Sequence, residues 1–243
     1  MDQSIYNGSV ISAKHIRKAR RRTPLDERVL PDYTRGEEIF NMVTHIVGGG
    51  IGVLTLIACV LLSAIKGSAA GVICGAVFGV SMITLYAMSS IYHGMRAGKA
   101  KKVLQVMDHC TIYFLIAGTY TPMLLCAMFE HAPIASILTF SAVWALAALS
   151  ITLTAIDLEK YKVFSMASYI GMGWAIIFSI KLMFEAIGPL SFGFLLGGGC
   201  LYTFGTLFYK MGKNKRYFHS VFHIFVVMGS VAHSLCVILC AMI

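Results

Sequence analysis

The chain has 243 residues, of which 58% are hydrophobic and only 13% are charged, and its mean hydropathy is +0.77. A soluble domain of this size cannot bury so much apolar surface, so the composition indicates an integral membrane protein. The net charge of +9 calls for no nucleic-acid partner, because membrane topology accounts for it, as shown below.

The first 38 residues form a polar tail that contains the basic run KHIRKARRR, Lys14 to Arg22. No apolar core of a cleavable signal peptide precedes this run, so we expect the first span to direct insertion into the membrane. A basic segment beside a span is attracted to anionic lipids. We therefore predict a cytosolic tail over residues 1–38 that contacts anionic headgroups.

Seven apolar segments follow the tail, each close to the roughly 20 residues that cross a bilayer. Backbone groups must be paired inside lipid, and the alternating pattern of a membrane β-barrel is missing, so the segments are expected to be helices. The sequence predicts an all-α seven-transmembrane bundle over residues 39–243. The expected spans are Ile39–Ile65, Ala69–Met95, Val103–Ala127, Ala132–Ile156, Val163–Phe184, Pro189–Tyr209 and Tyr217–Ile243.

Two residue patterns within the spans concern packing. Gly71, Gly75 and Gly79 recur at every fourth position, which is typical of closely packed membrane helices. The seven cysteines show no paired metal-binding spacing and are interpreted mainly as small packing residues.

The distribution of basic residues predicts the orientation. With a cytosolic N-terminus, 18 of the 20 lysines and arginines fall on the cytosolic side, and only Lys66 and Lys181 fall on the other. Cytosolic loops carry an excess of these residues. The sequence therefore predicts a cytosolic N-terminus and an external C-terminus in the cell membrane.

Four ionisable residues inside the spans share one depth. Each lies within seven residues of a predicted cytosolic loop, which is about 10 Å at the rise of an α-helix. They are His93, Asp108, His219 and His223. Ionisable groups are rare inside membranes and mark functional sites, so a shared layer indicates one site.

The chemistry of this layer points to zinc. His219 and His223 are four residues apart, so both can direct a ring nitrogen at one point, and His93 can supply a third ligand. Catalytic zinc takes three protein ligands and keeps a fourth position for water. Asp108 is then placed to hold and deprotonate that water, while Ser89, one turn before His93, can orient a ligand or stabilise an oxyanion.

A second polar stripe lies at the start of the first span, where Glu38, Asn41 and His45 share a helix face. Two interpretations stay open. The stripe borders the histidine layer, or it faces loops and water at the membrane interface.

Four blocks of sequence, taken together, resemble a known family: EEIFNMVTHIVGG, SSIYH, MDHCTIYFLIAGTYTP and YFHSVFHIFVV. They are similar to bacterial haemolysin III proteins, within the progestin and adipoQ receptor superfamily, and the resemblance runs from Glu37 to the end of the chain. It implies an intramembrane zinc site near the cytosolic face, with the family's site residues matching those at 89, 93, 108, 219 and 223. Because adiponectin receptors of this superfamily are linked to ceramide hydrolysis, the resemblance also implies lipid amide chemistry.

We therefore expect a zinc-dependent intramembrane hydrolase whose substrate, a lipid amide or ester, enters from the bilayer. Two alternatives stay open: a non-catalytic sensor of membrane lipid or fluidity with a structural zinc, and a membrane-lytic protein of the haemolysin type.

Overall fold

The computed structural model describes residues 22–212 and 214–242, so the basic run from Lys14 to Arg21 lies outside the described residues. Within the described part the fold is all-helical, as predicted, and contains no strand. In chain order the elements are η1 (Leu25–Glu27), α2 (Arg35–Ile65), α3 (Ala69–Gly94), α4 (Lys99–Pro122), η2 (Met123–Met128), α5 (Pro133–Ile156), α6 (Lys162–Gly173), η3 (Ala175–Ser179), α7 (Ile180–Met211), α8 (Phe218–Val237) and η4 (Ile238–Met242).

Helix α2 begins at Arg35, earlier than the predicted span at Ile39, because its first turn is capped. The Thr34 hydroxyl accepts a hydrogen bond from the Glu37 backbone N–H at 3.2 Å, and the Glu37 carboxylate accepts one from the Thr34 N–H at 2.8 Å. This capping box satisfies two backbone donors that the helix itself leaves unpaired. The helix therefore extends past the apolar span into the polar region.

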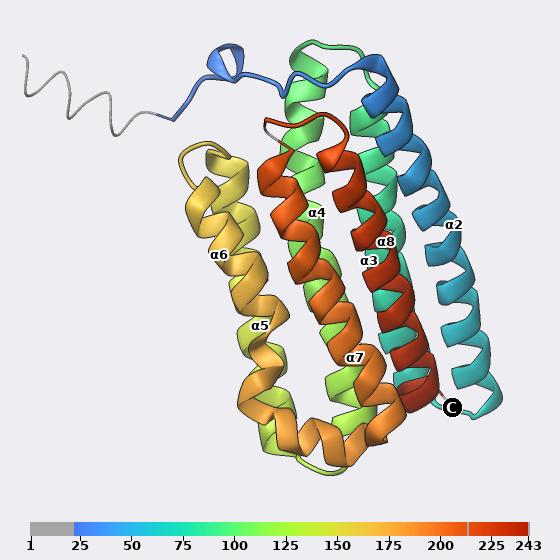
Figure 1. Ribbon diagram of the computed structural model, residues 1–243. Helices are drawn as coiled ribbons and strands as arrows, with labels where there is room; N and C mark the ends of the chain where they lie inside the picture. Colours follow the sequence, from blue (N-terminus) through green and yellow to red (C-terminus); the bar gives the residue numbers. More distant parts are fainter. Residues whose placement is uncertain (1–21, 213, 243) are drawn as a thin grey trace, which may run out of the picture.

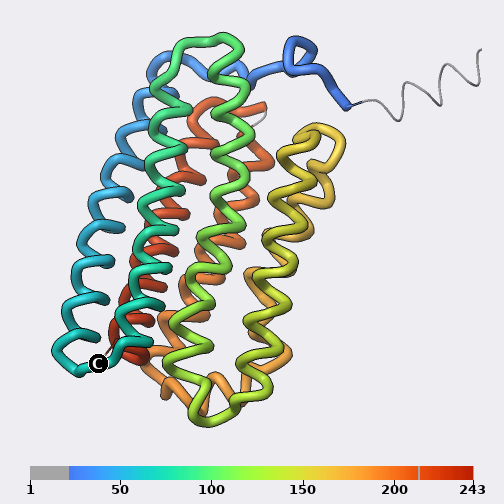
Figure 2. Tube along the Cα trace, turned by 180° about the vertical axis from the view of Figure 1, so that it is seen from behind, coloured from blue at the N-terminus to red at the C-terminus, as the bar shows by residue number. Residues whose placement is uncertain are grey.

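The helices pack as one bundle, with α8 against both α2 and α7, and α3 between α2 and α4 (Figures 1 and 2). The glycine stripe explains the close approach of α2 and α3. A Cβ atom on Gly75 would lie 2.7 Å from Cβ of Cys59, and one on Gly79 would lie 2.5 Å from Cβ of Leu56. The prediction of close packing at these glycines is confirmed, because no larger residue fits at this distance.

The described residues contain six helical segments long and apolar enough to cross a membrane. One of them, Lys162–Met211, has 50 residues, whereas about 20 suffice for one crossing. It includes η3 and a break at Gly188, which has a φ of 71° that favours glycine. In Figure 1 the chain descends along α6, crosses the lower end of the bundle and returns along α7. The two predicted spans Val163–Phe184 and Pro189–Tyr209 both fall within this one segment.

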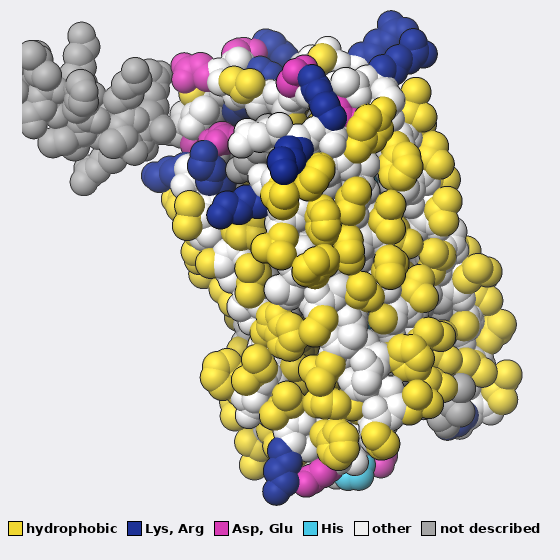
Figure 3. Space-filling model, viewed as in Figure 1, with side chains coloured by type: hydrophobic (Ala, Val, Ile, Leu, Met, Phe, Trp, Pro, Cys, Tyr) yellow, Lys and Arg dark blue, Asp and Glu magenta, His cyan; other side chains and the backbone are white. Residues whose placement is uncertain are grey.

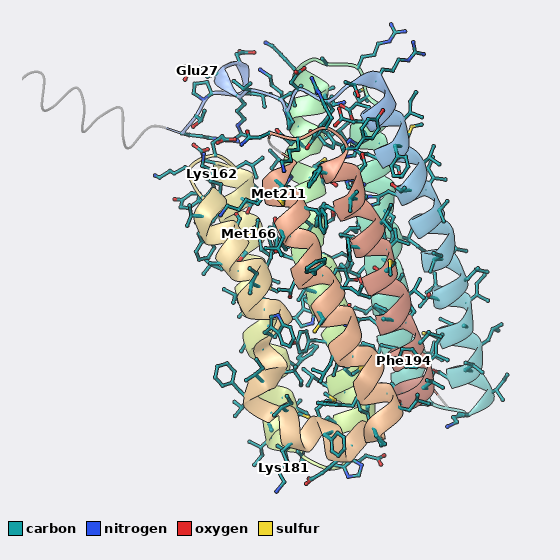
Figure 4. The ribbon with its side chains drawn as sticks, in the orientation of Figure 1. Glu27, Lys162, Met166, Lys181, Phe194 and Met211 are labelled. Atoms are coloured by element: carbon teal, nitrogen blue, oxygen red, sulfur yellow. The ribbon has the colours of Figure 1, made fainter. Side chains whose placement is uncertain are left out.

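The surface is apolar along the sides of the bundle and charged at its ends. Exposed apolar side chains occur on every long helix, for example Leu54, Ile73, Leu138 and Leu190. Figure 3 shows basic and acidic residues gathered at the upper end, and Figure 4 marks Lys181 at the opposite end. An apolar belt between two polar ends is the surface that a lipid bilayer requires.

Candidate metal centre

Three histidines from two helices meet near the upper end of the bundle. Potential ligand atoms of His93, on α3, and of His219 and His223, on α8, all lie within 4.8 Å of one another. The Nε2 atoms of His219 and His223 are 3.1 Å apart, as expected for residues one helical turn apart that point the same way. The structure thus brings together the three residues that the sequence analysis assigned to a metal.

The start of α8 is fixed by an unusual backbone conformation. Tyr217 precedes the helix with a φ of 61°, a left-handed conformation that bulky residues rarely adopt. Its backbone N–H donates a hydrogen bond of 2.7 Å to the Glu37 carboxylate at the start of α2. This contact holds the tight turn that leads directly into His219 and His223.

Hydrogen bonding of His93 leaves one ring nitrogen available. Nδ1 lies 2.6 Å from a Glu38 carboxylate oxygen, while Nε2 is buried and has no hydrogen-bond partner in the part of the chain that the structure describes. Nδ1 of His223 is likewise buried and unpartnered among those residues. Buried polar atoms without partners are costly in an ordinary core.

The donor set fits a metal ion. All three imidazoles are buried, with 2% of His93, 8% of His219 and 2% of His223 exposed. Buried histidines of an ordinary core would be paired with other protein groups, whereas here Nε2 of His93 has no partner among the described residues and Nε2 of His219 and of His223 face only each other. Imidazole nitrogen is a ligand for zinc, copper, iron and nickel rather than for magnesium or calcium. The cluster can therefore bind a transition-metal ion.

Asp108 and Ser89 lie near the cluster but outside it. Both line the same cavity as His219 and His223, and Ser89 is buried. The Asp108 side chain is 16% exposed, and its carboxylate lies 3.9 Å from Nδ1 of His109. The structure places these two residues on the wall of the cavity that His219 and His223 also line, and their predicted catalytic roles stay predictions.

The polar stripe on α2 is buried against the cluster. The His45 ring stacks on the His223 ring with centroids 3.7 Å apart, and neither His45 nitrogen has a partner among the described residues. Asn41 is fully buried, and its side-chain amide is unpartnered in the same part of the chain. Of the two open interpretations, the structure favours the one in which the stripe borders the histidine layer.

The segment Arg22–Thr34, here called the strap, crosses the upper end of the bundle before α2 begins (Figure 1). Its Tyr33 ring stacks on His219 with centroids 4.9 Å apart and an interplanar angle of 19°. Burial raises the pKa of the Tyr33 phenol well above its usual value, so the hydroxyl stays protonated and can donate a hydrogen bond. Because its ring stacks on His219, Tyr33 covers the histidine cluster on the side of the strap.

Sequence reasoning missed Tyr33 as well as Lys101, whose ammonium donates a 2.6 Å hydrogen bond to Glu38. A signal for Lys101 existed, because it lies seven residues before Asp108 and shares its helix face. No periodic signal marks Tyr33, which lies before the first helix.

An apolar cavity of about 210 Å³ begins at this cluster and continues along the bundle interior. Its polar head contains Tyr33, Ser89, Asp108, His219 and His223. The rest is mostly apolar and is supplied by α4, α6, α7 and α8, as with Ile112, Ile116, Met166, Leu195 and Val226; Figure 4 marks Met166 on α6. The cavity combines one polar end with a hydrocarbon-like wall.

The helical fold, the apolar belt and the histidine cluster define a multi-pass membrane protein with a candidate metal site. A family model described as haemolysin-III related matches residues 33–234. The chain belongs to this family, which confirms the resemblance in its sequence.

Named relatives agree with this assignment. A hemolysin-3 homolog of Bacillus subtilis (strain 168) is 35% identical over 209 residues, which are 85% of this chain and 95% of the relative. Hemolysin-3 of Bacillus cereus is 36% identical over 202 residues, covering 83% and 90% of the two chains. The human monocyte to macrophage differentiation factor is 27% identical over 164 residues, covering 65% and 66%, and fits the progestin and adipoQ receptor superfamily.

Proposed function

We propose that this protein is a zinc-dependent intramembrane hydrolase that cleaves a lipid amide or ester. The observation that carries the proposal is the cluster of His93, His219 and His223, two of which, His219 and His223, line the polar head of an apolar cavity. A hydrolase for lipids needs this combination, because the polar bond must reach the reacting groups while the acyl chain stays in hydrocarbon-like surroundings.

Zinc is the metal that suits three imidazoles from two helices. Three protein ligands and one open position are the usual arrangement of catalytic zinc sites, and three histidines are one such ligand set. When bound, zinc supplies a Lewis acid that lowers the pKa of a bound water to about 7 and polarises a carbonyl. The three histidines would hold the ion, and Tyr33, stacked on His219, would limit access of bulk water to the site.

Asp108 is proposed as the general base. Its carboxylate lines the cavity beside the histidines and is largely shielded from solvent, so it can accept the proton of the attacking water. Ser89 lies one turn before His93 and lines the same cavity, where its hydroxyl can orient the substrate carbonyl. The acyl chain occupies the apolar part of the cavity and enters laterally from lipid.

The proposed topology has seven spans, a cytosolic N-terminus and an external C-terminus. Two spans are assigned to the folded-back segment Lys162–Met211, and one to each of the other five candidate segments. The bias of basic residues toward one end of the bundle supports this orientation in the cell membrane. It places the histidine cluster in the cytosolic leaflet and the basic tail against anionic headgroups.

A non-catalytic role is the second candidate. The histidines join α3 to α8, so a bound metal would also link two helices that are far apart in sequence. A structural staple of this kind suits a sensor of lipid or membrane fluidity. The name of the bacillary relatives suggests a lytic protein as a further alternative.

Purified protein in lipid nanodiscs tests the proposal through metal content and hydrolysis of fluorescent ceramide and ester analogues. We expect one zinc per chain and release of fatty acid. Asp108→Asn should retain zinc and lower turnover by about 100-fold or more, because the amide keeps the shape of the carboxylate and loses its basicity. Glu159→Gln, at an exposed carboxylate, is the control.

Two results would contradict the hydrolase. Zinc-loaded protein without turnover of any amide or ester would favour the sensor, and protein that binds no metal would exclude both roles. Unchanged turnover in Asp108→Asn would exclude Asp108 as the base.

A further inference from the structure

We infer that Glu38, held by Lys101, is a positioning residue that sets the tautomer and orientation of His93 for metal binding. The inference rests on the proposed function, because it concerns the same histidine cluster. It assigns a role to a residue of α2, a helix that supplies none of the three ligands.

Each of the two carboxylate oxygens of Glu38 has its own hydrogen-bond partner. One oxygen lies 2.6 Å from Nδ1 of His93, and the other accepts a 2.6 Å hydrogen bond from the Lys101 ammonium. Lys101 also donates to the Met95 carbonyl at 3.0 Å, and its side chain is only 6% exposed. A mostly buried ammonium at this distance requires an ionised partner, so Glu38 is a carboxylate and can only accept.

The tautomer of His93 follows from this geometry. Because Glu38 can only accept, Nδ1 of His93 must carry the proton and donate it to the carboxylate. A neutral imidazole with a protonated Nδ1 presents Nε2 as its lone-pair nitrogen. That atom is the one left buried and unpartnered among the described residues. Glu38 therefore prepares the correct nitrogen for a metal and restricts rotation of the ring.

The neighbouring carboxylate supplies a contrast within the same helical turn. Glu37 caps α2 and accepts from the Tyr217 backbone N–H, so it acts on the start of α8 and touches no metal-ligand ring. A simple interhelical ion pair between Glu38 and Lys101 would stabilise the bundle without changing the state of the His93 ring. A positioning role of Glu38 and a purely structural ion pair can be distinguished by the protonation of the His93 ring nitrogens, because only the first fixes a proton on Nδ1.

The test combines zinc affinity with NMR of ¹⁵N-labelled histidine in nanodiscs. The wild-type protein should show a zinc-bound imidazole with a slowly exchanging Nδ1–H, assigned to His93 by its loss in His93→Gln. Glu38→Ala should weaken zinc binding by about 10- to 100-fold, the usual effect of removing a carboxylate behind a ligand histidine, and should abolish the slow signal. Glu38→Gln keeps an acceptor oxygen, so compared with Glu38→Ala it should recover part of the zinc affinity and part of the slowly exchanging Nδ1–H signal.

Glu159→Gln is the matched control, since this carboxylate is exposed and pairs with Lys162 at the surface. It should leave affinity and the His93 signal at wild-type values. Wild-type zinc affinity together with a wild-type His93 signal in Glu38→Ala would overturn the inference and leave the proposed function intact. Failure of the wild-type protein to bind zinc would overturn both.

Discussion

Glu37 and Glu38 are neighbours in sequence but bind different helices, because successive side chains on an α-helix point about 100° apart. Glu37 reaches the turn before α8, and Glu38 reaches His93 on α3 and Lys101 on α4. Both carboxylates lie in the first turn of α2, where the helix dipole also favours negative charge. One helical turn thus contacts both helices that carry the histidine cluster.

Replacing Lys101 by methionine should destabilise the protein by roughly 3 kcal/mol, because it leaves the Glu38 carboxylate, only 18% exposed, without its ammonium partner. Unfolding in mixed detergent micelles measures the change. Lys162→Met is the control, since its pair with Glu159 is exposed on both sides and should contribute less than about 1 kcal/mol.

Adding Glu38→Gln to Lys101→Met should restore part of the lost stability, because the unpaired charge is removed. Equal stability of the Lys101→Met and Lys162→Met proteins would contradict this account of the ion pair.

At the scale of elements, the strap is attached to the bundle through hydrogen bonds and ion pairs at several points. The Thr23 N–H donates to the Asp157 carboxylate at 2.7 Å, beyond the end of α5. Burial raises the pKa of Asp157, but hydrogen bonds from the backbone N–H groups of Thr23 and Lys160 lower it by more, so the pKa lies below its usual range. Other attachments are Lys102 to the Asp26 carbonyl, Lys99 to the Asp26 carboxylate, and Arg216 to Asp32.

The strap should stay attached at neutral pH and loosen in acid. A carboxyl whose pKa is lowered by folding contributes its full stabilisation above its ordinary pKa of about 3.9, and loses it as pH falls through the lower folded value. Asp157→Asn should loosen the strap already at neutral pH, raising amide exchange in peptides that cover residues 22–34 about 10-fold.

Hydrogen–deuterium exchange of Asp157→Asn and of Glu159→Gln, an exposed carboxylate nearby, provides the comparison. Equal exchange in the strap of both variants, or strap protection in the wild type that declines well above pH 4, would argue against Asp157 as the anchor.

At the scale of the whole molecule, the polar groups are unevenly divided between the two ends of the bundle. The strap lies at the end where basic residues gather, and Lys181 marks the other end (Figures 1, 3 and 4). The histidines belong to the strap's end of the bundle, because His93 lies at the end of α3, His219 lies in the first turn of α8, and Tyr33 of the strap stacks on His219. With the proposed topology, the cluster faces the cytosolic leaflet.

Cysteine labelling tests this orientation independently of the chemistry. In a background without the seven native cysteines, Gly98→Cys should react with an impermeant thiol reagent only after the membrane is opened. Gly98 is exposed between α3 and α4, and a side chain there meets no neighbour within 4 Å. Glu130→Cys, in the exposed turn before α5, should react in intact cells. Reversed labelling would place the cluster in the outer leaflet.

The sequence predicted the elements better than the contacts between them. Hydropathy located the helices, and the distance of each histidine from the end of its span selected His93, His219 and His223. Hydropathy and position within a span can both be read from local sequence. Lys101 was missed because its partner lies on another helix, and Tyr33 because its strap has no periodicity. The break at Gly188 fell between two predicted spans, but η3 and the helical turns after it were not foreseen.

The separation of the histidines along the chain has a consequence for synthesis. His93 is made and inserted long before His219 and His223, which belong to the final helix. During that interval Nε2 of His93 lacks the neighbouring histidines of α8, and the glycine-lined pair of α2 and α3 can already form. At the proposed metal site, acquisition of the ion would therefore be a late event of biogenesis, and a ribosome that stalls before α8 would leave a nascent protein that is inserted but lacks two of the three candidate ligands.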